Sequence, residues 1–436
     1  MAGILIVFGL FFAWGSYSLW ALWTVYGAQV MAAIQSIGLP EWLTANIGGI
    51  IAIFFGLIVL SLGFAIVASM IARRLGGTLI YIGAFFLNVI TLGIAIIPII
   101  LGVPISTAWP IFIPGIFTLL ITLLLLTVFK DRVRRAGEII KLTGQVTLDE
   151  KGTFVPPLLT MIFTLISAMM FGAIILQFTP VEVFLGTQEL TIENGWPIGV
   201  GLVLFLFMTI FFYQFSYATT SGIVYIYMRG RDPTLGDGYR AALGVIGGII
   251  VLSLASVVVV IIQMILRRIG REAGGVGAVV GGTAAGIVGW IWALINYFTI
   301  PAMVAEELGA KDGIKRSAGL VKNNFVDVII KETAVRWAFG VLAFIFFIGF
   351  ALAGAAIGWF FTGDLITTLI ITVVFVIFSS IPSTLVLRTF DIVYVTLLYV
   401  FIRRQEGDFR ETVIPAAMER ELSNAYDSAQ RSGPDL

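Results

Sequence analysis

Apolar residues form long stretches along this chain, separated by shorter polar segments. Ten stretches have roughly the length, about 20 residues as a helix, that crosses the hydrocarbon core of a bilayer. Their residues do not alternate between apolar and polar, as the strands of a membrane barrel would. The pattern therefore predicts an all-α, polytopic transmembrane helix bundle of about ten spans. The spans are expected at 3–34, 47–72, 78–101, 111–129, 154–178, 198–228, 241–266, 275–304, 337–361 and 365–402.

Two of these regions allow a second topology. Residues 365–402 would form a helix of about 57 Å, which Pro382 should bend. One bent helix is preferred, because two short spans would put the basic run 403–411 outside the cell. Glycines within 241–304 leave open two re-entrant segments in place of two full spans.

Composition agrees with a membrane protein. Of the residues, 59% are hydrophobic and 12% are charged, which is more apolar surface than a soluble domain can bury. With the N-terminus in the cytoplasm, most Lys and Arg residues fall in cytoplasmic segments, as the positive-inside rule requires. Arg267, Arg268 and Arg271 fall outside, and Arg388 lies within a span. Both termini are therefore expected in the cytoplasm.

The residue types present exclude several kinds of function. The chain has no cysteine and no histidine, which rules out disulfides, zinc thiolates, histidine-ligated haem and Ser–His triads. A net charge of +1 gives no general attraction for nucleic acid. Acidic residues are scattered in loops rather than paired for catalysis. We expect a protein that is not an enzyme, that holds no cofactor or metal and that binds no nucleic acid.

The polar segment 130–153 divides the chain. Before it lie four spans that contain almost no charge, and after it lie six spans with longer connections. We therefore expect a four-span N-terminal membrane unit at 1–136, a six-span membrane domain at 137–405 and a polar cytoplasmic tail at 406–436.

The connection between the eighth and ninth spans is rich in charge. Its apolar residues still recur at steps of three and four, which predicts an amphipathic helix near 311–332. Lys315, Arg316 and Lys322 lie off the apolar stripe, where they would meet the phosphates of lipid headgroups. Three roles are open: a tether that fixes the angle between two spans, recognition of a specific anionic lipid, and binding of a cytoplasmic partner.

Residues 274–289 carry two ladders of small residues four positions apart. Such ladders let the backbones of two membrane helices approach closely. A phosphate-binding loop is not indicated, because no Lys-Ser/Thr pair follows. Close helix packing is the preferred interpretation, and a flexible or re-entrant gate is the alternative. The glycines concerned are Gly274, Gly277, Gly281, Gly282, Gly286 and Gly289.

Charged residues at two further places are candidate sites. Arg388 and Asp391 lie three positions apart within the last span, where they can pair. A charge pair at membrane depth serves either structure or transport. Asp232 and Asp237 could bind a cation, but a helix cap at Asp232, before Pro233, is the preferred interpretation.

Three motifs occur in order along the second part of the chain: "MRGRDPTLGDGYRAAL" (228–243), "ILRRIGREAGGVGAVVGG" (265–282) and "FTIPAMVAEELGAKDGIKRSAGLVKNN" (298–324). With these motifs, residues 137–405 resemble a family of uncharacterised multipass prokaryotic membrane proteins, classified as a domain of unknown function. The third motif is also similar in pattern to the membrane domain associated with glycerophosphodiester phosphodiesterases. The resemblance implies a membrane fold in the cytoplasmic membrane of a prokaryote, and it implies no activity.

These features together predict a non-catalytic, membrane-embedded subunit or scaffold. Such a protein would contact membrane lipids and assemble with itself or with a protein partner. A transporter or channel for a small amphiphile or lipid is the alternative. A carrier driven by protons or sodium usually places carboxylates in its core, and among the acidic residues only Asp391 is expected at that depth.

Overall fold

A computed structural model describes residues 2–36, 47–179, 191–407 and 409 of the chain. Within these residues all regular secondary structure is helical, which confirms the all-α prediction. Contacts group the chain into two compact units, each assembled from separate segments. The first unit comprises Met1–Gly56, Val155–Gly222 and Gly238–Ala318, and the second comprises Leu57–Phe154, Ile223–Asp237 and Gly319–Leu436.

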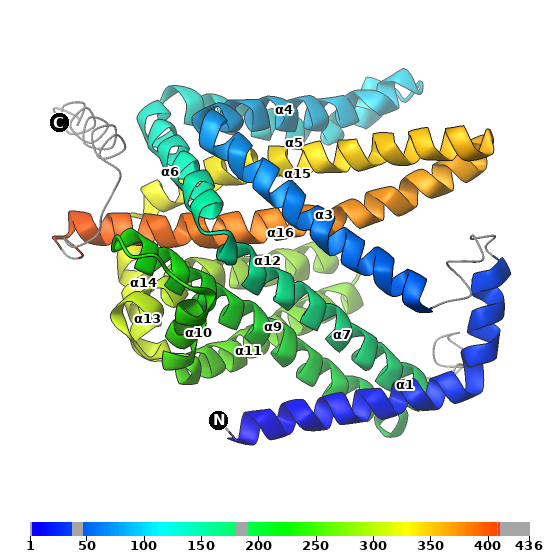
Figure 1. Ribbon diagram of the computed structural model, residues 1–436. Helices are drawn as coiled ribbons and strands as arrows, with labels where there is room; N and C mark the ends of the chain where they lie inside the picture. The colour runs from blue at the N-terminus through cyan, green and yellow to red at the C-terminus, as the bar shows by residue number, and fades with distance from the viewer. Residues whose placement is uncertain (1, 37–46, 180–190, 408, 410–436) are drawn as a thin grey trace. The chain divides into compact units, whose positions relative to one another are not determined.

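Each helix falls wholly or mainly into one unit. Figure 1 labels the helices. The first unit holds α1 (Ala2–Ser36), α7 (Val155–Phe178), α9 (Ile192–Met228), α10 (Leu235–Gly244), α11 (Ile246–Glu272), α12 (Gly275–Ile295), α13 (Thr299–Glu306) and α14 (Ala310–Asn323). The second unit holds α3 (Ile47–Leu75), α4 (Gly77–Ile100), α5 (Ile105–Thr127), α6 (Lys130–Asp149), the 3₁₀ turn η1 (Lys151–Phe154), α15 (Phe325–Thr362) and α16 (Leu365–Gln405).

Nine helical stretches in the described residues are long and apolar enough to cross a membrane. They correspond to the second to tenth predicted spans, and the first predicted span is helix α1. Residues 365–402 lie in one helix, as expected, with Pro382 inside it. Helices α11 and α12 have 27 and 21 residues, so each has the length of a full span. The chain therefore has the character of a polytopic integral membrane protein.

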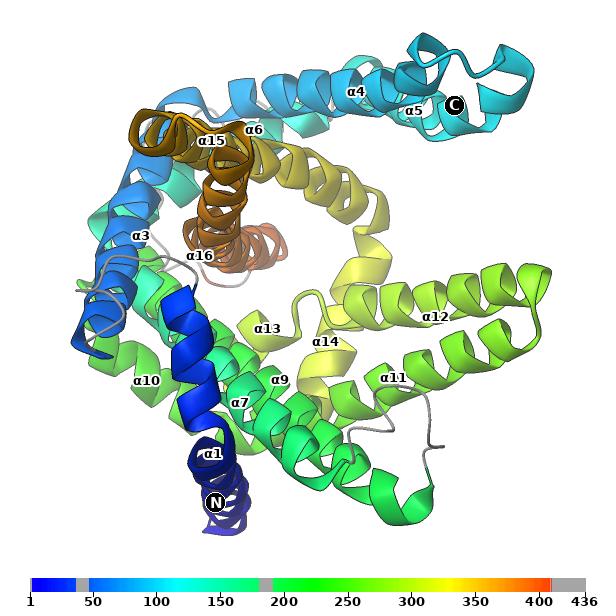
Figure 2. The ribbon, with the colours of Figure 1, turned by 90° about the vertical axis from the view of Figure 1, so that its right-hand side faces the viewer.

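Aromatic and aliphatic side chains hold the first unit together. Phe11 of α1, Ile174 of α7 and Met208 of α9 are fully buried against one another. Helices α11 and α12 form an antiparallel hairpin, which both ribbon views show side by side (Figures 1 and 2). Lipid tails are as apolar as leucine, so moving an apolar side chain from lipid into a helix contact gains little free energy. Close van der Waals packing is therefore what mainly stabilises contacts between membrane helices.

The second unit is built around the α15–α16 hairpin. Small residues let these two helices approach closely, because a methyl group added at Gly358 would lie 2.8 Å from the Cα atom of Thr368. At the other end of the hairpin, Phe390 and Tyr394 of α16 are buried and both rings contact Phe339 of α15. Helix α6 packs against α4, α15 and α16.

The polar segment 130–153 is mostly helix α6 rather than a linker. One face of α6 is buried, including Val133, Ala136, Ile140 and Val146. These residues recur at steps of three, four and six, so the amphipathic pattern of a helix was present in the sequence. Its charged residues, Arg135 excepted, lie outside this face, so α6 packs on apolar helices without burying most of its charges.

The amphipathic helix expected near 311–332 is instead two helices. Helix α14 ends at Asn323, and α15 begins at Phe325 and continues into a membrane-length stretch. The side-chain amide of Asn324 donates to the backbone oxygen of Leu320 over 3.1 Å. Asparagine competes with helical hydrogen bonds in this way, which explains why the apolar stripe continues while the helix does not.

The predicted division into a four-span unit, a six-span domain and a tail remains a prediction. The compact units interleave these parts, since α1 packs with α7 while α4 packs with α15. Residues 410–436 of the tail lie outside the described part of the chain.

Candidate functional site

The two small-residue ladders of α12 have different surroundings. We call Gly277, Gly281, Ala285 and Gly289 the closed ladder, because it faces α11. A methyl group added at Gly281 would lie 2.6 Å from the Cα atom of Gly270 and 2.6 Å from the backbone oxygen of Leu266. Ala285 is fully buried. The closed ladder therefore brings the backbones of α11 and α12 almost into contact.

The other ladder, which we call the open ladder, consists of Gly274, Ala278, Gly282 and Gly286. No described atom outside their own helix lies within 4 Å of a methyl group added at Gly282 or Gly286. Both glycines are exposed. Only 6% of the most apolar part of this span is buried, against 28% in most of the other membrane-length helices. Among the described residues of its own unit, none packs against the open ladder at Gly282 or Gly286.

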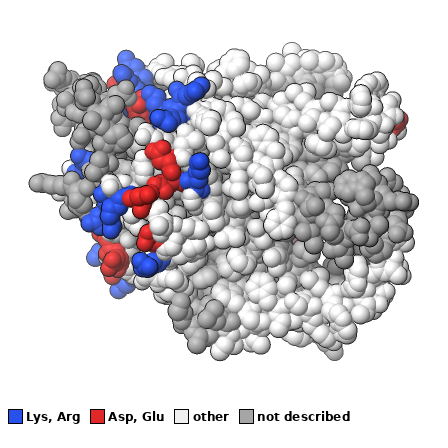
Figure 3. All heavy atoms as spheres, viewed as in Figure 1, with Lys and Arg blue, Asp and Glu red and all other residues white. Residues whose placement is uncertain are grey.

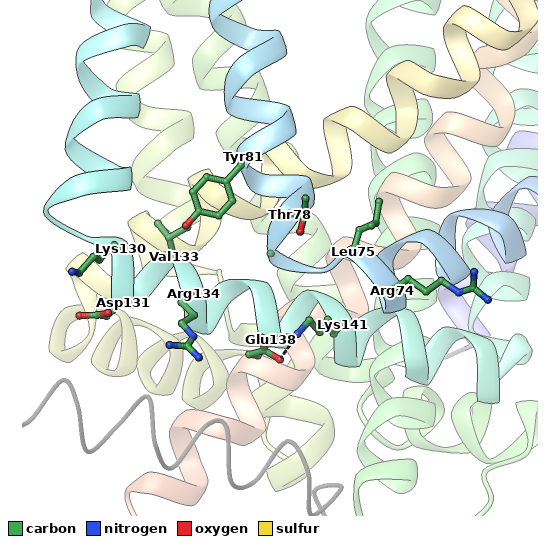
Figure 4. Close-up of a pocket in the computed structure, with 11 residues that line it drawn as sticks. Arg74, Leu75, Thr78, Tyr81, Lys130, Asp131, Val133, Arg134, Glu138 and Lys141 are labelled. Carbon is green, nitrogen blue, oxygen red and sulfur yellow. Dashed lines mark hydrogen bonds and ion pairs between the residues drawn. The ribbon is translucent and has the colours of Figure 1, made fainter.

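A pocket of about 550 Å³ lies between the α3–α4 turn and helix α6 (Figure 4). Figure 4 shows α6 running across the ends of α4 and α5, with the Tyr81 side chain reaching from α4 toward it. Four basic and two acidic side chains line the pocket, so its net charge is positive. They are Arg74, Lys130, Arg134 and Lys141, with Asp131 and Glu138.

Glycines on both sides of this basic pocket allow the backbones of its walls to approach closely. Gly76 has a φ of +39°, which glycine adopts without strain, and it joins α3 directly to α4. Across the pocket, a methyl group added at Gly137 of α6 would lie 2.5 Å from the Cα atom of Gly77. This close approach brings residues that are sixty positions apart in the sequence, such as Gly77 and Gly137, into one site. Sequence analysis missed the pocket, because no local motif signals it.

Charged side chains avoid the long helices. On the face shown in Figure 3, Lys, Arg, Asp and Glu gather mainly over α6 and the short helices, and the surface over the long helices is almost uncharged. In the second unit, Arg73, Arg74, Arg403 and Arg404 all lie at helix ends. This distribution is typical of helices whose middle parts are surrounded by hydrocarbon.

The structure places the predicted headgroup residues on α14. Lys315 and Lys322 are exposed, whereas Arg316 is half-buried and forms an ion pair with Glu306 of α13, with 3.2 Å between Nε and Oε1. The buried face of α14 includes Ser317, whose hydroxyl accepts a hydrogen bond from the Phe298 backbone amide over 2.9 Å. Helix α14 is thus fastened to α13, and a headgroup role for its three basic residues stays a prediction.

Arg388 and Asp391 both lie in α16, and both are partly exposed. The charged side chains that act on Asp391 include Glu332 and Arg336 of α15. Those two side chains pair with each other at 2.6 Å. Asp391 therefore belongs to a charged group shared by both helices of the hairpin, and its pairing with Arg388 stays a prediction.

The helix cap expected at Asp232 is formed instead by Thr234, two residues later. The Thr234 backbone amide and hydroxyl donate to the Asp237 carboxylate over 3.0 and 2.6 Å, and the Asp237 amide donates back to the Thr234 hydroxyl over 3.2 Å. This reciprocal pattern is a capping box for α10, whose signature Thr-x-x-Asp was present in the sequence. Asp237 is therefore engaged in the cap rather than in a site shared with Asp232.

Asp232 lies instead beside Glu150 at the end of α6. Burial raises the pKa of Glu150 above its ordinary value, and the neighbouring carboxylates of Asp232 and Asp149 raise it further. The Tyr227 hydroxyl donates to Asp149 over 2.7 Å. In the described part of the chain, no group of three or more acidic residues is arranged to hold a metal ion.

The raised pKa of Glu150 predicts a pH-dependent effect of Glu150→Gln. The folded protein binds this proton more tightly than the unfolded chain, so stability is lost as pH rises from the ordinary pKa of 4.5 through the raised value. Glutamine has no titratable proton, so the variant does not lose this stability as pH rises. We expect Glu150→Gln to melt at a higher temperature than wild type at pH 7.5 and at the same temperature near pH 4. An equal difference at both pH values would contradict the assignment, and Glu272→Gln is the control for loss of one exposed carboxylate.

Polar side chains also join helices of the first unit within their membrane-length stretches. Gln214 of α9 accepts a hydrogen bond from Ser253 over 3.0 Å and donates to Ser256 over 3.2 Å, both on α11. The Trp292 indole of α12 donates to Ser256 over 3.3 Å. Interhelical hydrogen bonds in membranes contribute about 0.6 kcal/mol each on average. This network adds modestly to the packing of α9, α11 and α12, and sequence analysis missed it.

Comparison with protein-family models gives a match over the second part of the chain. No curated protein matches the sequence. Residues 197–409, slightly less than half of the chain, match the model of a family of unknown function (DUF6159). The match lies almost wholly within the part, 137–405, whose motifs resemble uncharacterised multipass membrane proteins, and this region is therefore similar to a family whose function is not known.

Proposed function

We propose that the protein is a non-catalytic, membrane-embedded subunit that assembles with a second copy of itself through the open ladder of α12. The single observation that carries the proposal is the contrast between the two ladders. The glycines of the closed ladder pack against α11, whereas no described residue of the same unit packs against Gly282 and Gly286 of the open ladder, which has the same spacing of small residues. Both termini are proposed to lie in the cytoplasm of a prokaryote.

The open ladder has the chemistry of a self-association surface. Gly282 and Gly286 are four residues apart with Thr283, Ala284 and Ala285 between them, which forms the Gly-x-x-x-Gly spacing. Two copies of such a face can pack backbone against backbone, because the grooves left by glycine fit the ridges of a second identical helix. Association about a twofold axis requires only that one surface be complementary to itself.

The proposed orientation rests on the charge distribution in the second unit. The helix ends that carry Arg73, Arg74, Arg403 and Arg404 belong to the same unit as the basic helix α6. The α15–α16 turn carries the acidic residue Asp364 instead. Basic segments remain preferentially in the cytoplasm, so this asymmetry supports cytoplasmic placement of α6 and of the C-terminal tail.

A transporter for a small amphiphile or lipid is the alternative function. The observation that favours it is Asp391, a carboxylate within a membrane-length helix that interacts with Glu332 and Arg336. Charged groups at this depth often mark transport pathways. If transport is the function, Asp391→Asn should abolish the flux measured in proteoliposomes and leave self-association unchanged.

The open ladder predicts which glycine substitutions affect assembly. Gly286→Leu is expected to convert a dimer into a monomer without loss of melting temperature, because leucine separates the two copies, while no described residue outside its own helix lies within 4 Å of a methyl group added at this position. The measurement is the mass of the protein in lipid nanodiscs or mild detergent by light scattering. Gly349→Leu on α15 is the matched control, since it adds the same side chain at an exposed glycine with equally open surroundings.

Two results would contradict the proposal. One is a wild-type protein that is monomeric at every concentration in native lipid. The other is a Gly286→Leu variant that keeps the wild-type mass, or a Gly349→Leu control that loses it equally.

A further inference from the structure

We infer that the basic pocket between α3, α4 and α6 binds the phosphate of an anionic phospholipid whose acyl chain lies along α4. This binding site is separate from the open ladder of α12 and does not depend on self-association. The inference rests on three observations: basic side chains that form no ion pair with another described residue, the hydrogen-bond donors around them, and an apolar stripe that begins at the pocket.

Three basic side chains of the pocket are available to a ligand. Lys141 is already engaged, because its Nζ lies 2.8 Å from Oε1 of Glu138. Arg74, Lys130 and Arg134 form no ion pair with any other residue in the described part of the chain, and all three are exposed. Like charges repel one another, so gathering them in one pocket is favoured when an anion binds between them. Arginine in particular matches the geometry of phosphate oxygens with two parallel hydrogen bonds.

Neutral groups of the pocket suit the same ligand. Thr78 and Gly77 belong to the first turn of α4 and line the pocket. Backbone amides of a first helical turn have no intrahelical acceptor and carry partial positive charge, which attracts phosphate. The pocket volume of about 550 Å³ lies in the range of roughly 300–1,000 Å³ that is usual for sites of small organic molecules. A headgroup therefore fits the space better than a bare ion.

An apolar stripe connects the pocket to the lipid-facing part of α4. Tyr81 lines the pocket and is 49% exposed, and Phe85 and Val89 follow at four-residue steps with exposed fractions of 63% and 49%. Residues four apart lie on the same face of a helix. A ligand with its phosphate at Arg74 and Arg134 would thus find a continuous apolar surface for an acyl chain. Basic pockets beside membrane helices bind anionic lipids in this arrangement.

The test uses the full-length protein in mixed micelles and a triple variant, Arg74→Gln with Lys130→Gln and Arg134→Gln. Binding of phosphatidylglycerol is followed by native mass spectrometry and by the rise in melting temperature. We expect the triple variant to bind at least tenfold more weakly. The matched control is Arg267→Gln with Arg268→Gln and Arg271→Gln, which removes the same charge at the end of α11 and should bind like wild type. If the triple variant does not fold, the single variant Arg74→Gln, at the exposed end of α3, replaces it.

Further ligands separate a lipid from other phosphate sources. Phosphatidylcholine, which carries no net charge, should bind at least tenfold more weakly than phosphatidylglycerol. Inorganic phosphate and glycerol 3-phosphate should also bind at least tenfold more weakly, since neither has an acyl chain. Equal binding of phosphatidylglycerol by wild type and the pocket variant would overturn the inference. Equal losses in the pocket variant and the α11 control, or binding of inorganic phosphate as tight as that of the lipid, would overturn it as well.

Discussion

Gly83→Ala is expected to destabilise the protein severely. A methyl group at this position of α4 would overlap the backbone oxygen of Trp337 in α15, and backbone atoms of a packed helix cannot move aside cheaply. Overpacking of a close contact costs about 1–3 kcal/mol, and more where neither side can relax. We expect the upper end of this range or beyond, seen as a lower melting temperature in detergent and a lower yield of folded protein.

Gly93→Ala is the matched control for this substitution. Gly93 lies in the same helix, and nothing outside it lies within 4 Å of an added methyl group. Alanine is favoured over glycine in a helix interior by about 0.5–1 kcal/mol, so this variant should melt slightly above wild type. If Gly83→Ala and Gly93→Ala melted at the same temperature, the close contact between α4 and α15 would be excluded.

Gly281→Leu is expected to separate α11 from α12. The added side chain would start 2.6 Å from the Cα atom of Gly270, so the hairpin could close only if both helices moved apart. We expect a loss of more than about 3 kcal/mol, or failure to fold, because leucine is larger than the methyl group that already overlaps. Thermal unfolding in detergent, followed by the fluorescence of the tryptophans, measures this loss.

The neighbouring position gives the sharpest comparison. Gly282→Leu adds the same side chain one residue later, where no described residue outside that helix lies within 4 Å of a methyl group added to α12. It is expected to keep the wild-type melting temperature and to lose self-association. A loss of stability as large as that of Gly281→Leu would show that the open ladder also packs within the chain.

The sequence was sufficient to predict the long helices and the close packing of α12 through its small residues. Hydrocarbon imposes strict limits on length and polarity, so apolar stretches such as Gly77–Ile100 are visible without any tertiary information. The spacing of glycines likewise identified both ladders. It did not show which ladder faces α11, because that choice depends on how the hairpin turns at Gly274, whose φ is +80°.

The features that sequence analysis missed depend on contacts between residues far apart in the sequence or on a choice between neighbouring residues. Arg74 and Arg134 are sixty residues apart, and only the crossing of α6 over the start of α4 brings them into one pocket. Helix α6 was not predicted, because a charged segment between two spans is usually a loop. Its buried residues nevertheless recur at helical steps. Asp232 and Thr234 are both good capping residues, and the box formed with Asp237 determined which one begins α10.

Assembly through the open ladder of α12 is tested most directly by disulfide cross-linking in native membranes. The chain has no cysteine, so Thr283→Cys, placed between Gly282 and Gly286, introduces a single reactive thiol. A disulfide requires two Cα atoms within about 7 Å, which a second copy packed on this ladder provides. We predict an oxidised dimer for Thr283→Cys, its loss when Gly286→Leu is added, and none for Phe360→Cys on α15, although Phe360 is 82% exposed. A Thr283→Cys protein that stays monomeric under oxidation, or that cross-links no more than Phe360→Cys, would contradict assembly through α12.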